Sequence, residues 1–293
     1  MKKLFFISML AAAALLGGLT ACNNELGEPQ ADRVPENAVR ITASIYNPFA
    51  ATRSMPLGTA EEQTKFKAGD EILVYVNDDH TRRAIYRFDG SVWTPKDGKY
   101  LLWKSDQEDF RAFYPAEWGS VHISGAPYDY QTDQSSIDKI AKADLMQAVL
   151  DPAKTKEVLH FAMQRSTARL IVKIAGFNSE FPAGTKVDNV RFLNKIGSSG
   201  PLVTYTPYAE GEGEAGSTYT VLVPSDAANN TVSLTVGSKA MTAKLQDYSH
   251  DVGKSYTYRL TVGKEKLELG EVTVADWSGS AVITGGEANL SKW

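Results

Sequence analysis

The chain alternates apolar and polar residues in short runs, the pattern of half-buried β-strands. The clearest run covers residues 39–45, in which the residues on one face are Val39, Ile41, Ala43 and Ile45. Further short runs follow from Glu71 onward and are separated by turn pairs such as Asp89-Gly90. Short strands between turn residues are typical of a β-sandwich or barrel. The pattern therefore predicts an all-β protein.

Strand signals continue to the end of the chain and indicate two tandem β-sandwich domains. Glu157–Ile174 is the longest strand region, and we expect it to close the first domain. Glycine and proline residues follow it and place the boundary near residues 175–180, which gives domains of residues 38–175 and 176–293. Ser135-Ser136-Ile137-Asp138 suggests a helix cap. We expect at most one short helix, in the first domain.

The N-terminal residues have the features of an export signal. Two lysines precede the apolar run Leu4–Leu19, which is short for a bilayer span of about 20 residues and fits a secretory signal peptide. Leu19-Thr20-Ala21-Cys22 resembles a bacterial lipobox, which implies cleavage before Cys22 and diacylation of its sulfur. We predict a signal peptide over residues 1–21 and a polar lipid tether over residues 22–37.

The composition of the exported chain limits the classes of partner and of stabilising bond that it can have. Without residues 1–21 the chain has 272 residues and a formal charge of −6, which argues against nucleic acid as a partner. Cys22 is the only cysteine, so no disulfide stabilises the fold. No later apolar run is long enough to span a bilayer.

The sequence contains no motif that predicts catalysis, a metal or a cofactor. The four histidines, at positions 80, 122, 160 and 250, are far apart in the chain and lack metal-ligand spacing. We expect His160 to point to solvent from a strand. Nucleophile-elbow and phosphate-binding motifs are absent from the sequence. A set of aromatic residues could stack on sugars, although strand packing is their default role: Tyr100, Trp103, Phe113, Tyr114 and Trp118.

Short motifs along most of the exported chain carry a resemblance to a known family. They are Ala51–Ser54, Phe66–Ile72 (FKAGDEI), Ala112–Pro115 (AFYP), Ala143–Met146 (ADLM), Leu159–Phe161 (LHF), Gly253–Val262 and Val274–Trp277 (VADW). In order and spacing they resemble the fimbrillin-like lipoproteins of Bacteroidales. One position departs from the pattern, because many relatives have a histidine where this chain has Met163.

The resemblance implies a function and a location. It implies sandwich domains of transthyretin-like type and a structural or adhesive subunit of cell-surface fimbriae, or pili, delivered to the outer membrane by the lipid on Cys22. In this family a protease cuts after an arginine in the N-terminal region, the first strand leaves, and a strand from a neighbouring subunit replaces it. The implied partners are other fimbrial subunits and a receptor on a host or bacterial surface.

The residues themselves supply candidates for this processing. The exchanged strand would be residues 39–45, and the candidate cleavage sites are Arg33, Arg40 and Arg53. Arg53 is the best candidate, because a cut there frees the whole strand. A cut at Arg40 falls inside the strand, and a cut at Arg33 leaves it intact.

Three alternatives remain open at the level of sequence. Residues 39–45 could be an ordinary edge strand that is never removed. Trp277–Trp293 could donate a strand or complete its own sandwich. The protein could also be a surface-anchored lipoprotein that binds glycans and does not polymerise.

Overall fold

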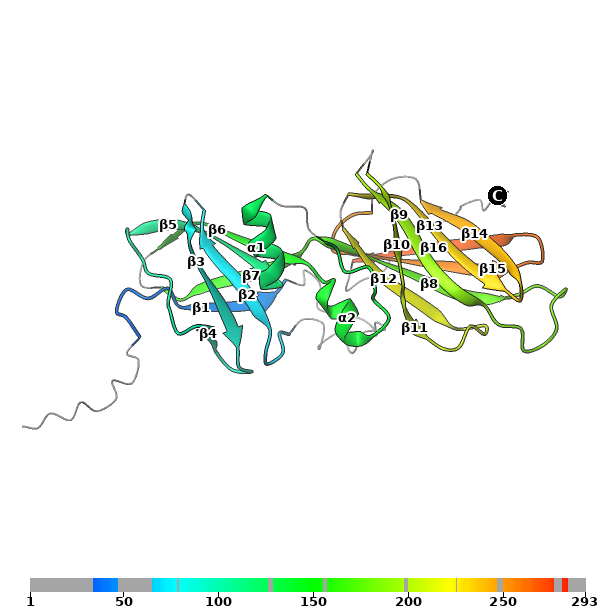
Figure 1. Ribbon diagram of the computed structural model, residues 1–293, viewed down its shortest axis with the longest axis horizontal. Helices are drawn as coiled ribbons and strands as arrows, with labels where there is room; N and C mark the ends of the chain where they lie inside the picture. Colours follow the sequence, from blue (N-terminus) through cyan, green and yellow to red (C-terminus); the bar gives the residue numbers. More distant parts are fainter. Residues whose placement is uncertain are drawn as a thin grey trace, which may run out of the picture. The chain divides into compact units, whose positions relative to one another are not determined.

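A computed structural model of the chain (Figure 1) describes residues 34–46, 65–77, 79–125, 129–154, 157–197, 200–224, 226–246, 250–276 and 281–283. The described residues all belong to one compact unit, Val34–Trp293. Strands predominate in this part of the chain, so the predicted all-β class is confirmed. In the same residues, no helix has the length and apolar character needed to cross a membrane.

The N-terminal sheet has seven strands, in the order β1-β7-β6-β5-β2-β3-β4. They are β1 Ile41–Ile45, β2 Glu71–Val76, β3 Asp79–Phe88, β4 Trp93–Pro95, β5 Gln107–Tyr114, β6 Met146–Lys154 and β7 Leu159–Arg165. All neighbours are antiparallel except β1 and β7, which are parallel. One face of these strands forms a hydrophobic core that includes Ile72, Val74, Phe110, Phe161 and Met163.

The turn between β3 and β4 shows how local sequence sets this topology. Gly90 has a φ of 106°, a conformation that glycine adopts without steric cost. The Asp89 carboxylate accepts hydrogen bonds from the backbone N–H groups of Ser91 and Val92, at 2.7 and 2.8 Å. The predicted Asp-Gly turn is therefore confirmed.

Two sheets form the C-terminal part (Figure 1) and share one hydrophobic core. The six-stranded sheet has the order β11-β12-β8-β15-β16-β17, with β8 Thr167–Phe177, β11 Tyr208–Glu210, β12 Thr218–Pro224, β15 Lys254–Val262, β16 Leu267–Asp276 and β17 Ala281–Ile283. The four-stranded sheet has the order β10-β9-β13-β14, with β9 Asp188–Ile196, β10 Leu202–Tyr205, β13 Ala227–Val236 and β14 Lys239–Gln246. Buried side chains from both sheets contribute to this core, which is the arrangement of a β-sandwich.

The predicted position of β8 is wrong. We expected Glu157–Ile174 to close the first domain, but β8 lies in the six-stranded sheet, antiparallel to β12 and parallel to β15. The chain passes from the seven-stranded N-terminal sheet to the six-stranded sheet at Ser166, between β7 and β8. Alternation identified the strand but could not identify partners that lie about 50 and 90 residues further along the chain.

The described residues include two helices, so the expectation of at most one is also wrong. The predicted helix is α2, Ile137–Lys142, and the Ser136 side chain caps it by accepting a hydrogen bond from the backbone N–H of Lys139 at 3.3 Å. The unexpected helix is α1, Ala116–Ser124. A Cβ atom at Gly119 would lie 2.7 Å from the Cβ of Phe113, so this glycine lets α1 approach the sheet closely. Tertiary packing thus favours a helix that its interior glycine disfavours.

The segment before α2 contacts the C-terminal sheets through Gln134, which is fully buried. Its amide oxygen accepts a hydrogen bond from the backbone N–H of Leu222 at 2.7 Å, and its amide nitrogen donates to the Leu222 carbonyl at 2.8 Å. The Gln134 backbone N–H donates to the Thr206 carbonyl at 2.9 Å. The side chain therefore pairs with the backbone of β12 as a neighbouring strand would.

Candidate functional site

The candidate site is the first strand together with the elements that hold it. These are β7, residues 101–103 and Tyr86 of β3, and the space between them that the strand fills is called the groove. Among the described strands, β1 lies at one edge of the N-terminal sheet and has β7 as its neighbour. The two strands pair in register from Ile41 opposite Leu159 to Ile45 opposite Met163. Beyond the strand, the backbone N–H of Tyr46 donates to the Met163 carbonyl at 2.7 Å. Within the described sheet, β1 is thus an edge strand that pairs in parallel with β7.

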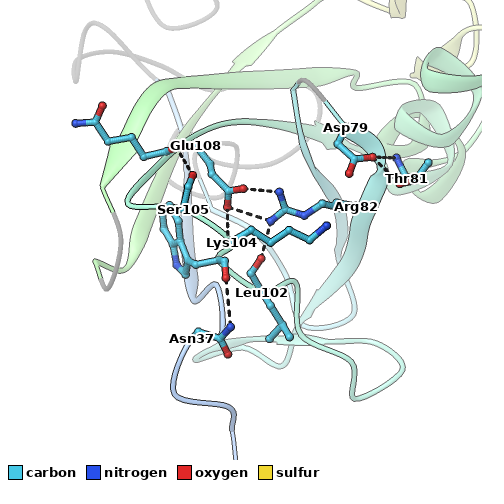
Figure 2. Close-up of polar contacts among 10 residues, drawn as sticks. Asn37, Asp79, Thr81, Arg82, Leu102, Lys104, Ser105 and Glu108 are labelled. Atoms are coloured by element: carbon cyan, nitrogen blue, oxygen red, sulfur yellow. Dashed lines mark hydrogen bonds and ion pairs between the residues drawn. The ribbon is translucent and has the colours of Figure 1, made fainter.

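The residues before β1 are held from the other side by residues 101–103. The Val39 N–H donates to the Leu101 carbonyl at 2.7 Å, and the Trp103 N–H donates to the Asn37 carbonyl at 2.9 Å. The Asn37 side chain also donates to the Trp103 carbonyl at 3.2 Å (Figure 2). Among the described residues, this short pairing is an isolated antiparallel bridge between Ala38 and Leu102. Residues 37–46 therefore lie between two separate backbone segments.

An ion pair fixes residues 101–103 without any contribution from β1. The Arg82 guanidinium binds both carboxylate oxygens of Glu108 and donates to the Leu102 carbonyl at 2.7 Å, and the Lys104 N–H donates to the same carboxylate at 3.2 Å (Figure 2). Burial works against ionisation of Glu108, but the hydrogen bonds from Arg82 and Lys104 hold its pKa below the usual value. The side chains of Arg82 and Glu108 are only 13% and 7% exposed, so this anchor is largely shielded from solvent.

The inner face of the first strand belongs to the N-terminal core. Val39 is fully buried, Ile41 and Ile45 are 5% and 9% exposed, and Ala43 is partly buried against the same cluster. The predicted division of faces is therefore confirmed. Tyr86 lies on β3, and its buried hydroxyl donates to the Val39 carbonyl at 2.7 Å. A strand distant from β1 in the sheet order therefore also holds the first strand.

Replacing Tyr86 with phenylalanine should weaken the attachment of this strand. Phenylalanine keeps the ring but removes the buried donor to the Val39 carbonyl, a change that costs about 1–2 kcal/mol of folding free energy. Urea unfolding at pH 7 measures the loss. Tyr46→Phe is the matched control, because Tyr46 is half exposed and joins β7 only through its backbone in the interactions described. Equal stabilities for the two variants would contradict the assigned role of the Tyr86 hydroxyl.

The other predicted site residues are distributed as follows. Cys22, Arg33 and Arg53 lie outside the described residues. Arg40 is exposed, and its backbone carbonyl accepts a hydrogen bond from the Leu159 N–H at 2.9 Å. In the part of the chain that the structure describes, no group of three or more His, Cys, Asp or Glu side chains could hold a metal ion.

The aromatic residues considered as a sugar platform are mostly packed into the protein. Trp103 and Phe113 are 7% and 1% exposed. Trp103 packs edge-on against Phe110, whereas Phe113 packs against Trp118 of α1. Tyr114 packs against Phe66. These residues do not share one exposed face, and this disfavours a stacking platform.

Sequence reasoning missed three side chains that hold the first strand or the segment beside it: Arg82, Tyr86 and Glu108. Tyr86 gave a usable signal, because a tyrosine at an inward strand position needs a partner for its hydroxyl. Arg82 and Glu108 gave none, since their pairing depends on strands that meet only in the folded chain.

Comparison with known proteins agrees with this fold. The fimbrillin-like family model matches residues 52–277. A solved candidate cell adhesion protein from Bacteroides uniformis is 18% identical, with 82% of this chain and 98% of that chain covered and a TM-score of 0.51. Another, from Bacteroides ovatus, is 14% identical, with 83% and 98% covered and a TM-score of 0.56. Among functionally curated proteins, none matches significantly. The match to the family model covers most of the chain, and the chain belongs to the fimbrillin-like family.

Proposed function

We propose that this protein is a structural or adhesive subunit of cell-surface fimbriae that assembles by strand exchange. Family membership supports the fimbrial role. The observation that carries the exchange mechanism is the placement of β1: an edge strand whose inner face completes the core and whose groove has walls anchored by other elements. The proposed role is structural rather than catalytic.

Removal of the first strand would leave a surface suited to a replacement strand. It would expose the apolar groove and free the backbone groups of β7 and of residues 101–103 that now pair with residues 37–46. Unpaired strand edges bind other strands by β-augmentation. The Arg82–Glu108 ion pair lies outside the removed segment and would keep one wall of the groove in place.

We also propose how the precursor is delivered and processed. Residues 1–21 would direct export, lipid on Cys22 would hold the precursor at the outer membrane, and residues 22–37 would form the tether. A cut after Arg53 would release the lipid and the first strand together. Arg40 is a poorer site, because its carbonyl is already bonded to β7.

The domain organisation that we infer is two β-sandwiches of transthyretin-like type. The first would begin at residue 38, as predicted from the sequence. Because β8 pairs within the six-stranded sheet, we move the boundary from residues 175–180 to Ser166. The second domain would then begin with β8 and extend through β17.

Limited digestion of the full-length precursor with an arginine-specific protease tests this function. We expect cleavage after Arg53, loss of the first strand, and oligomers on size-exclusion chromatography. Arg53→Lys should block both cleavage and assembly, whereas Arg33→Lys is the control and should permit both. A cleaved product that remains monomeric, with unchanged stability, would contradict strand exchange.

A further inference from the structure

One histidine of β7 bridges two hydroxyl groups on the outer face of β1. Thr42 Oγ1 lies 3.0 Å from His160 Nδ1, and Ser44 Oγ lies 3.0 Å from His160 Nε2. His160 stands directly opposite Thr42 in the strand register. The prediction that His160 simply points to solvent is therefore incomplete: the ring is exposed, but both of its nitrogens contact β1.

Hydroxyl groups suit these contacts, because a hydroxyl can bond to a ring nitrogen that donates and to one that accepts. A neutral imidazole has one donor and one acceptor nitrogen, a charged one has two donors, and a hydroxyl can serve as donor or acceptor. Thr42 and Ser44 can therefore bond to His160 in each state. An alkyl side chain at either position offers no partner.

The inner face of the same pair of strands is selective by size. Ala43 stands opposite Phe161, which is fully buried, whereas Ile41 and Ile45 stand opposite Leu159 and Met163. The smallest side chain of the strand thus faces the largest side chain of that stretch of β7. A longer side chain in place of Ala43 would overpack a filled core.

The hydroxyl contacts of His160 and the small residue opposite Phe161 together fix the register of β1 against β7, which the apolar face alone does not fix. A slip by two residues keeps apolar residues inward, so alternation does not exclude it. Such a slip would place Ile41 or Ile45 opposite Phe161 and would bring Arg40 or Tyr46 into the place of a hydroxyl. Both slipped registers lose a hydrogen bond to His160 and crowd Phe161.

We propose that His160 and Phe161 are specificity-determining residues, which select for this groove a strand with the pattern hydroxyl–small–hydroxyl, fixed in one register. In the described structure the pattern is Thr42-Ala43-Ser44. A strand of another subunit that replaces β1 would need the same three residue types, parallel to β7. This last step rests on the proposed strand exchange, whereas the role of His160 toward β1 does not.

Hydrogen exchange in the full-length protein tests the role of His160 directly. The Tyr46 amide, which donates to β7, is the probe. We expect His160→Ala to speed its exchange about tenfold, Thr42→Val with Ser44→Ala to do the same, and the triple variant to do no more than either. Thr94→Val, at an exposed position of β4, is the control and should leave this amide unchanged. Additive effects, or no effect of His160→Ala, would overturn the proposal.

Peptide binding tests selection of an incoming strand. A peptide of residues 36–47 is added to precursor cut after Arg53, beside one peptide with Thr42→Val and Ser44→Val and another with Ala43→Leu. We expect each altered peptide to bind about tenfold more weakly than the unaltered peptide. On His160→Ala protein, the valine peptide should bind as tightly as the unaltered peptide. Equal binding of all three to unmodified protein would overturn the proposal. Failure of every peptide would instead contradict strand exchange, and hydrogen exchange would still decide the role of His160.

Discussion

Replacing Asp144 with asparagine is expected to lower the free energy of unfolding by about 3–5 kcal/mol, the usual cost of removing one member of a buried ion pair. The Arg165 Nε donates to both oxygens of the Asp144 carboxylate, at 3.0 and 3.1 Å. The side chains of Arg165 and Asp144 are 7% and 17% exposed. Asparagine keeps the size of the side chain, removes its charge and replaces one of the two acceptor oxygens with an amide donor, so the expected loss includes the charge and one hydrogen bond.

A second arginine makes this carboxylate more important. Arg169 is fully buried, and its Nε donates to the Ser255 hydroxyl at 3.0 Å. Its pKa lies well below the usual value, because burial and the positive charge of Arg165 disfavour the charged form, whereas Asp144 favours it. Removing the Asp144 charge therefore withdraws compensation from two shielded cations at once.

The two arginines and their partners lie where the chain passes from the N-terminal sheet to the six-stranded sheet. Asp144 follows α2, Arg165 ends β7, Arg169 lies in β8, and Ser255 lies in β15. Loss of the carboxylate is thus expected to loosen the connection between the N-terminal sheet and the six-stranded sheet, and not only one of them.

Urea unfolding at pH 7 measures the effect of Asp144→Asn. Asp106→Asn is the control, because Asp106 is exposed near the start of β5, and surface substitutions of this kind usually change stability by about 0.5 kcal/mol or less. A loss below about 1 kcal/mol for Asp144→Asn would show that the two arginines are compensated by other groups.

Local patterns in the sequence predicted much of the fold. Alternation identified β1 and its inward residues, the Asp-Gly pair identified a turn, and Ser136 marked the start of α2. In each case the cause lies within a few neighbouring residues. The α1 helix escaped prediction because its stability depends on the close approach of Gly119 to Phe113 of β5, a tertiary contact that local sequence does not specify.

The candidate site was predictable on one side only. Residues of β1 could be assigned to an inner face, because one strand carries that information. The walls of the groove could not, since they combine residues 101–103, Tyr86 on β3 and His160 on β7. The parallel pairing of β1 with β7 joins positions 118 apart, and no short-range signal specifies it. Cleavage at Arg53 and lipidation of Cys22 stay predictions.

Acidification is expected to destabilise the C-terminal sandwich through His250, which is 2% exposed. Its Nδ1 lies 3.1 Å from the amide nitrogen of Asn230, which also donates to the Ala227 carbonyl at 3.1 Å. This amide orientation makes Nδ1 an acceptor, so Nε2 carries the proton and donates to the Tyr258 hydroxyl at 2.6 Å. A proton added at Nδ1 would face a donor, and the site therefore holds the neutral ring.

The pKa of His250 gives the size and direction of this effect. Burial lowers the pKa from 6.5 to about 4, so between these values the unfolded chain binds more protons than the folded one. Stability attributable to the histidine is complete above pH 6.5 and falls as the pH drops toward 4. The pKa difference corresponds to about 3 kcal/mol lost between pH 7.5 and pH 4.

Comparison of the wild type with His250→Gln isolates this contribution from the carboxylates that also titrate in acid. In urea unfolding at several pH values, the wild type should lose about 3 kcal/mol more than the variant between pH 7.5 and pH 4. Tyr258→Phe keeps the histidine buried, so it should retain most of the wild-type slope. Parallel pH curves for the wild type and His250→Gln would show that His250 gains its proton without unfolding. In that case the Asn230 amide must turn to present its oxygen to Nδ1, and the neutral ring is not required by the fold.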